Sequence, residues 1–131
     1  MRILLDTHIF LWFISGDTKL PRVVQDTVRD RANQVFLSPV SIWEAIVKHA
    51  LGRLSLPEPP QKYLPLQRGM HSVDTLPLDE NSVCRLSLLP PLHRDPFDRL
   101  LIAQAQIEDL TIVTSDPAFD AYDVRLLDAR S

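Results

Sequence analysis

The sequence predicts an α/β fold in three layers, with a short central parallel sheet flanked by helices. Three short apolar runs, 2–5, 34–37 and 110–114, have the length and composition of buried strands. The segments between them show helical spacing of apolar residues, and the connections are short. Strands that alternate with helices in this way are typical of a parallel sheet with helices on its faces.

The length and composition predict one domain spanning residues 1–131 with a packed core. Of the 131 residues, 45% are hydrophobic, which argues against disorder. The formal net charge of −3 argues against a broadly basic surface that coats nucleic acid. The single cysteine excludes an internal disulfide and a cysteine-based zinc site. The apolar runs are too short to span a bilayer, so we expect a soluble, cytoplasmic protein without membrane association.

The first apolar strand leads into a helix without a polar face. Asp6 follows the strand, and the residues over 8–15 read as a helix closed by Gly16. Because this helix is apolar nearly all round, it must be buried inside the domain or against a partner. The pattern over 21–31 is amphipathic and typical of a surface helix.

The second strand also leads into a helix, which we expect over residues 39–51. Ser38 suits the cap position and Pro39 the first helical position. Ser41 and Glu44 have the spacing of a capping box, which is a competing interpretation of the helix start. We favour Ser38, because Pro39 follows it, and Glu44 then lies inside the helix and is free for another role.

Acids followed by prolines mark the later helix starts. Asp95 suits the cap of a helix reaching to about Asp109, Pro96 its first position and Asp98 its first turn. Asp116 with Pro117 marks another start. The other expected elements are a proline-rich loop over 56–65, helices over 61–70 and 79–89, a weak strand over 73–78 and an edge strand over 124–127.

Four acids occupy matching positions, where a strand or loop gives way to a helix: Asp6, Glu44, Asp98 and Asp116. Functional groups collect beyond the carboxyl ends of parallel strands, so these side chains could converge at one edge of the sheet. Clustered carboxylates repel each other unless protons or a cation join them, and Mg²⁺ and Mn²⁺ prefer oxygen ligands. One such cation activates a water for phosphodiester hydrolysis, and a second, about 3.5–4 Å away, stabilises the leaving oxygen.

Other kinds of site have little support in the sequence. Glycine-rich nucleotide-binding motifs, the H-E-x-x-H zinc motif and the G-x-S-x-G nucleophile elbow are all absent. The four histidines are scattered, and we assign His93 no role although it precedes the acidic helix start. We interpret Trp12 and Trp43 as core or interface residues rather than RNA-stacking residues. Arg94 and Arg99 fit phosphate contacts, carboxylate pairs or solvated surface charge.

Four segments occur in an order and at separations that carry a family resemblance. They are Asp6-Thr7-His8 with Leu11-Trp12, Ser38 to Glu44, Asp95 to Ala103, and Thr114-Ser115-Asp116 with Phe119. Together these segments resemble the PIN-domain family, and more narrowly the VapC-type toxins of bacterial type II toxin–antitoxin systems. The resemblance implies an endoribonuclease that depends on Mg²⁺ or Mn²⁺, commonly forms a homodimer and is held inactive by a cognate antitoxin.

The resemblance also implies, by position, four catalytic acids that bind the metal: Asp6, Glu44, Asp98 and Asp116. It places the hydroxyl of Thr114 near the metal and implies that Thr7 helps to orient Asp6. Asp95 is either only the helix cap or an outer-shell acid, and we favour the cap.

Two other functions stay open from the residues. One is a non-catalytic α/β module that binds a protein partner, in which the acids are structural caps and the apolar helix docks the partner. Such a module predicts no metal-dependent activity. The other is a DNA-directed nuclease with the same acidic site, which the sequence does not separate from a ribonuclease.

Overall fold

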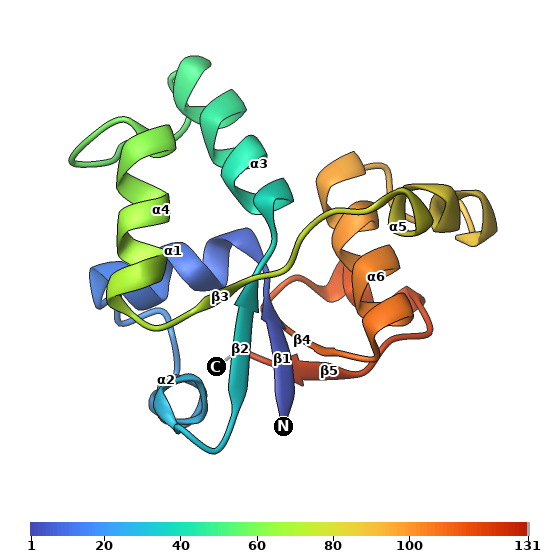
Figure 1. The fold of residues 1–131 in the computed structure, drawn as a ribbon, viewed down its shortest axis with the longest axis horizontal. Coiled ribbons are helices and arrows are strands. Elements are labelled where there is room, and N and C mark those ends of the chain that lie inside the picture. The colour runs from blue at the N-terminus through green and yellow to red at the C-terminus, as the bar shows by residue number, and fades with distance from the viewer. Residues whose placement is uncertain (131) are drawn as a thin grey trace.

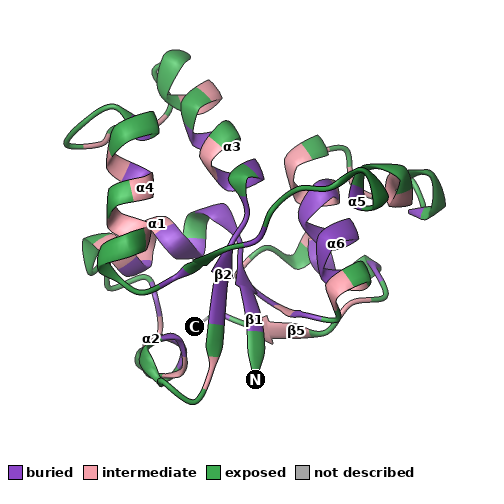
Figure 2. Ribbon diagram, viewed as in Figure 1, coloured by how far each residue is buried: buried purple, intermediate pink, exposed green. Residues whose placement is uncertain are grey.

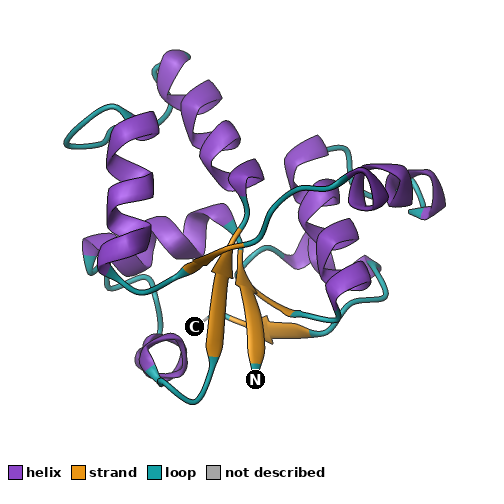
Figure 3. Ribbon diagram, viewed as in Figure 1, coloured by secondary structure: helices purple, strands orange, loops and turns teal. Residues whose placement is uncertain are grey.

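The computed structural model describes residues 1–130 and shows a five-stranded sheet flanked by helices (Figure 1, Figure 3). The strands are β1 (Arg2–Leu5), β2 (Gln34–Leu37), β3 (Asp74–Thr75), β4 (Thr111–Thr114) and β5 (Leu126–Asp128). The α-helices are α1 (Thr7–Ser15), α2 (Arg22–Arg29), α3 (Pro39–Ala50), α4 (Pro60–Met70), α5 (Glu80–Arg85) and α6 (Pro96–Glu108). Two 3₁₀ helices are η1 (Leu86–Leu88) and η2 (Pro117–Ala121).

The strand pairs in this sheet are all parallel, in the order β3-β2-β1-β4-β5. β1 lies at the centre, where Ile3 pairs with Val35 of β2 on one side and with Thr111 of β4 on the other. The predicted α/β fold with a short parallel sheet flanked by helices is confirmed. Because the strands run in one direction, residues that follow β1 and β4 emerge at the same edge of the sheet.

Alternate residues of the central strands face opposite sides of the sheet and build two cores. Figure 2 shows that much of β1 and β2 is buried. Ile3 and Leu5 of β1 pack in one core with buried residues of α1, α2 and α4. Leu4, between them, packs in the other core with the buried face of α6. β1 and β2 are therefore buried from both sides, which is why they read as continuous apolar runs rather than alternating ones.

Three elements, one strand and two helices, are shorter than the sequence predicts. The strand expected over 73–78 reduces to the two residues of β3, because Pro77 has no N–H to donate to a ladder. The helix expected over 79–89 divides into α5 and η1, and the start expected at Asp116 leads only into the 3₁₀ helix η2.

α1 buries one side of its apolar surface and leaves the other side partly exposed. Ile9, Phe10 and Phe13 are buried in the core, and Trp12 packs against the core from outside. Partly exposed apolar side chains line a groove of about 270 Å³ beside α1: Leu11, Trp12, Ile14, Leu54, Leu56 and Tyr63. Neither α1 nor any other helix within residues 1–130 has the length and apolar character that a membrane crossing requires.

Ser38 caps α3, as the sequence predicts. Its hydroxyl oxygen accepts a hydrogen bond of 3.1 Å from the Val40 N–H, and the side chain is fully buried. The competing capping box does not form, because Ser41 lies inside α3 and not at its start. The cap fixes where α3 begins and therefore where Glu44 lies along it.

Replacing Ser38 with alanine should lower the free energy of unfolding by about 1 kcal/mol or more, because the Val40 N–H would be left buried without a partner. Urea unfolding followed by circular dichroism measures this change. The matched control is Ser55→Ala, since Ser55 is exposed in the loop after α3. An equal loss in the two variants would contradict the role of the cap.

Candidate metal centre

The four predicted acids lie on segments that meet at the carboxyl edge of the sheet. Asp6 follows β1 directly, and Asp116 lies two positions after the end of β4. Glu44 lies in α3, and Asp98 lies in the first turn of α6. The negative charges of Asp6 and Glu44 both act on the pKa of Asp98, and that of Glu44 acts on the pKa of Asp6. Asp6, Glu44 and Asp98 are therefore close enough to interact electrostatically.

Asp6 caps α1 and is almost wholly buried, with 4% of its surface exposed. Its Oδ1 accepts a hydrogen bond of 2.9 Å from the Ile9 N–H, and its Oδ2 accepts one from the Thr114 hydroxyl. Burial raises the pKa of Asp6 above its ordinary value, although both hydrogen bonds oppose this effect. An ionised Asp6 is therefore unfavourable in the folded chain unless a cation offsets its charge.

Both carboxylate oxygens of the buried Glu44 have partners in the protein. Oε1 accepts a hydrogen bond of 2.6 Å from the Thr7 hydroxyl, and Oε2 forms an ion pair with Lys48, four residues further along α3. The Ser41 hydroxyl oxygen lies 2.9 Å from Thr7 Oγ1 and extends this network. Thr7 thus contacts Glu44, and not Asp6 as the resemblance implied.

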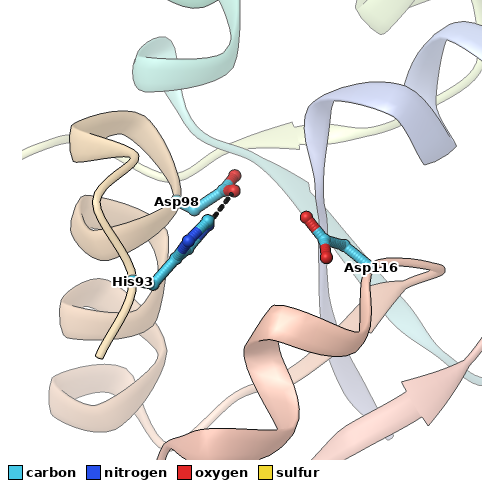
Figure 4. A group of neighbouring side chains, drawn as sticks. All are labelled: His93, Asp98 and Asp116. Atoms are coloured by element: carbon cyan, nitrogen blue, oxygen red, sulfur yellow. Dashed lines mark hydrogen bonds and ion pairs between the residues drawn. The ribbon is translucent and has the colours of Figure 1, made fainter.

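Three side chains, from His93, Asp98 and Asp116, form a compact group (Figure 4). One ligand atom each from His93, Asp98 and Asp116 lies within 4.8 Å of the other two. His93 Nε2 lies 2.8 Å from Asp98 Oδ2, and the Asp116 carboxylate points toward this pair. Burial and the charges of neighbouring acids raise the pKa of Asp98 to about 7, while the His93 hydrogen bond acts in the opposite direction.

Thr114 connects two of the acids through its buried hydroxyl. The hydroxyl donates to Asp6 Oδ2 and accepts a hydrogen bond of 3.0 Å from the Asp116 N–H. Asp116 Oδ1 in turn caps η2 by accepting from the Ala118 N–H at 2.9 Å. The hydroxyl that the resemblance places near the metal therefore lies between two of the predicted acids.

Asp95 acts as the cap of α6. Its Oδ1 accepts hydrogen bonds from the N–H groups of Phe97 at 2.8 Å and Asp98 at 3.2 Å. Its negative charge also contributes to the raised pKa of Asp98. The favoured interpretation of Asp95 as a helix cap agrees with this geometry.

We expect Asp95→Asn to retain both the cap and Mn²⁺ binding, because asparagine caps helices as well as aspartate does. Asp95→Ala should lower the free energy of unfolding by about 1 kcal/mol, because the cap is lost. Thermal unfolding and Mn²⁺ titration calorimetry on the two variants separate these effects. An Asp95→Asn protein with about tenfold weaker Mn²⁺ binding would instead make Asp95 an outer-shell acid.

Two basic side chains at the acids were not predicted from the sequence. Lys48 could have been found, because it stands four positions after Glu44 in a predicted helix and such pairs face each other. The sequence alone gives His93 no role, and the structure places its ring against Asp98. The only signal in the sequence was that His93 lies five positions before Asp98.

Two other candidate residues have structural contacts. The Arg99 guanidinium donates to the Pro90 carbonyl at 2.9 Å and to the Tyr122 hydroxyl at 3.1 Å, so it holds the loop before α6 and not a carboxylate. Trp43 is half exposed, and its ring packs edge-on against Phe97 with ring centres 4.7 Å apart.

The donor set suits a hard divalent cation. The converging side chains supply carboxylate oxygens, which Mg²⁺ and Mn²⁺ prefer over nitrogen or sulfur ligands. Burial raises the pKa of both Asp6 and Asp98, so a cation would relieve the same repulsion that protons relieve at low pH. Within the described residues, the group whose possible ligand atoms lie together is His93, Asp98 and Asp116, and the charges of Asp6 and Glu44 act on Asp98.

Comparison with known protein families identifies the fold family. The chain matches the PIN domain family over residues 3–125, a span that includes all four acids. The chain belongs to the PIN-domain family. PIN domains are generally nucleases, and an acidic site at the carboxyl edge of the sheet agrees with such chemistry. No curated protein sequence matches this PIN domain.

The fold of this PIN domain is similar to that of chains in solved VapBC complexes. A chain of VapBC2 from Rickettsia felis, bound to a DNA fragment from its promoter, has 16% identity, with 98% of each chain covered and a TM-score of 0.73. A chain of DNA-bound VapBC from Salmonella typhimurium has 18% identity, with 98% of each chain covered and a TM-score of 0.68. A chain of VapBC-1 from nontypeable Haemophilus influenzae has 16% identity, with 98% of each chain covered and a TM-score of 0.68. At these identities the likeness establishes a shared fold.

Proposed function

We propose that this PIN domain is the toxin of a toxin–antitoxin pair and acts as an endoribonuclease that depends on Mg²⁺ or Mn²⁺. The observation that carries the proposal is the convergence of acids whose burial raises the pKa of Asp6 and Asp98, since such a cluster favours a bound cation. Family membership supports nuclease activity. The proposal assigns metal binding and catalysis to four residues: Asp6, Glu44, Asp98 and Asp116.

The side chains around the acids would hold them ready for this cation. When bound, Mg²⁺ or Mn²⁺ would lower the pKa of the attacking water and offset the charge of the substrate phosphate. Thr114 orients Asp6, and Thr7 orients Glu44, before the cation binds. Cation binding at Glu44 Oε2 would compete with the ion pair to Lys48. Hydrolysis by water requires no covalent intermediate on the protein.

The apolar surfaces support protein partners. The groove beside α1 is lined by apolar side chains, and a cognate antitoxin segment is its proposed occupant. The likeness to chains of VapBC complexes supports a partner of this kind. Trp43 and Ile46 are exposed on one face of α3, which supports a homodimer. We further propose that residues 1–131 form a single domain that acts in the cytoplasm.

The decisive experiment is cleavage of matched RNA and DNA substrates by the purified protein. Single-stranded RNA, structured RNA and DNA of the same sequences are incubated with Mg²⁺ or Mn²⁺, and in parallel with EDTA. We expect RNA to be cut only when the cation is present. An Asp116→Asn protein purified in the same way controls for contaminating nucleases.

The other outcomes of this cleavage experiment would indicate different functions. Cleavage of DNA but not RNA would make the protein a DNA-directed nuclease with the same site. Absence of cleavage, together with absence of Mn²⁺ binding in calorimetry, would overturn the proposal in favour of a protein-binding module.

A further inference from the structure

The histidine that contacts Asp98 is held by a network separate from the acids. The loop that leads from η1 to α6 places the His93 ring against the carboxylate, with 2.8 Å between Nε2 and Oδ2. The side chains of both residues are largely enclosed, at 20% exposed for His93 and 14% for Asp98. The contact therefore joins a loop residue to an acid of the proposed site, away from bulk solvent.

The Tyr122 hydroxyl forms hydrogen bonds with Pro90 and His93, two residues of this loop. It accepts hydrogen bonds from the His93 N–H at 2.9 Å and from the Arg99 guanidinium at 3.1 Å, and it donates to the Pro90 carbonyl at 2.9 Å. Tyr122 is 6% exposed, so its hydroxyl is largely shielded from water and satisfied by these protein partners. The path of the loop is thus determined at both Pro90 and His93.

We propose that His93 is a positioning residue that fixes the Asp98 carboxylate for cation binding, and that Tyr122 fixes His93. The inference rests on the proposed function, because it assigns a role within the same acidic site. Burial and the negative charges of Asp95, Glu44 and Asp6 disfavour the ionised carboxylate of Asp98, and the His93 hydrogen bond favours it. A donor at Oδ2 holds the carboxylate in place against this repulsion and leaves Oδ1 available to the cation.

Two substitutions of His93 test the role. His93→Leu removes the donor and should weaken Mn²⁺ binding by about tenfold or more in titration calorimetry, as expected when an outer-shell partner is lost. His93→Gln places an amide N–H near the position of Nε2 and should restore most of the affinity. His49→Leu is the matched control, since His49 is exposed on α3 and contacts none of the acids within the described residues. Wild-type affinity in a folded His93→Leu protein would overturn the inference.

A variant remote from the acids tests the second part. Tyr122→Phe removes only the hydroxyl, and we expect it to weaken Mn²⁺ binding in the same direction as His93→Leu. It also serves as the test if His93→Leu does not fold. Unchanged Mn²⁺ affinity in Tyr122→Phe would overturn the role of Tyr122.

Spectroscopy separates positioning from direct ligation. Pulsed electron paramagnetic resonance of the Mn²⁺-loaded wild-type protein should show no directly coupled imidazole nitrogen. In the positioning role, His93 Nε2 is hydrogen-bonded to Asp98 and does not bind the cation. A coupled nitrogen that disappears in His93→Leu would overturn the positioning role and make His93 a ligand. Absence of Mn²⁺ binding to the wild-type protein would overturn the proposed function itself, whereas wild-type binding that His93→Leu does not alter overturns only this inference.

Discussion

Replacing Asp6 with asparagine should reduce cation-dependent RNA cleavage by at least about 100-fold, because loss of even an outer-shell partner of a metal costs about 10–100-fold. The same change should leave the protein folded and at least as stable. An asparagine Oδ1 can still accept the Ile9 hydrogen bond that caps α1. Burial raises the pKa of Asp6, so a neutral side chain removes an unfavourable charge from the folded state.

A second capping aspartate provides the matched control. Asp79 caps α5 by accepting from the Ser82 N–H at 2.8 Å, but it is exposed to solvent, and its hydrogen bonds lower its pKa. Asp79→Asn should therefore leave cleavage unchanged and lower the melting temperature slightly, which is the opposite sign to Asp6→Asn. Gel assays of cleavage and thermal unfolding without added metal measure the two effects. A fully active Asp6→Asn protein would contradict the acidic site.

Mn²⁺ should stabilise the folded protein, and the stabilisation should grow as the pH rises. The pKa of Asp98 is raised from its ordinary value of 3.8 to about 7, and that of Asp6 is also raised. In this pH window the folded chain holds protons that the unfolded chain has released, so the stability of the metal-free protein falls as the pH rises. Cation binding requires the ionised carboxylates and offsets their repulsion, so its effect increases over the same window.

Thermal unfolding with Mn²⁺ and with EDTA, from about pH 5 to about pH 8, measures how the stabilisation by Mn²⁺ depends on pH. With Mn²⁺ at about 100 times its Kd, the stabilisation should reach about 2.7 kcal/mol at the upper end of the range. The control is Asp98→Asn, which should flatten the pH dependence of the metal-free protein and reduce the gain from Mn²⁺. A gain that is the same at both ends of the range, or equal in Asp98→Asn, would contradict cation binding at these acids.

The parts of the structure that depend on local rules were predictable from the sequence. Buried strands read as apolar runs, and Ser38 and Asp95 were recognised as caps because each is followed by a proline. The acids could be placed at one edge of the sheet because parallel strands end together. Strand formation and helix capping depend largely on residues within a few positions of each other, and the parallel arrangement of the sheet then follows from the alternation of elements.

The contacts between side chains of different segments were not predictable in the same way. Thr7 contacts Glu44 because α1 and α3 approach each other in the fold, a fact that neither segment encodes alone. The His93 N–H donates to the hydroxyl of Tyr122, which stands 29 positions later in the chain. Such pairings depend on how loops and helices pack, so the sequence indicates the residue types of the site but not which of them meet.

The order of the strands in the sheet also determines when the acidic site can form during synthesis of the chain. β1 precedes the other strands of this sheet in the chain, yet its neighbour β4 is separated from it by more than a hundred positions, and Asp116 lies beyond β4. Pairing of such distant strands is a late, non-local event in folding. A nascent or truncated chain that ends before β4 lacks both Thr114 and Asp116. The chain should therefore be harmless to RNA until its last central strand has paired, and activity should disappear together with the tertiary structure on unfolding.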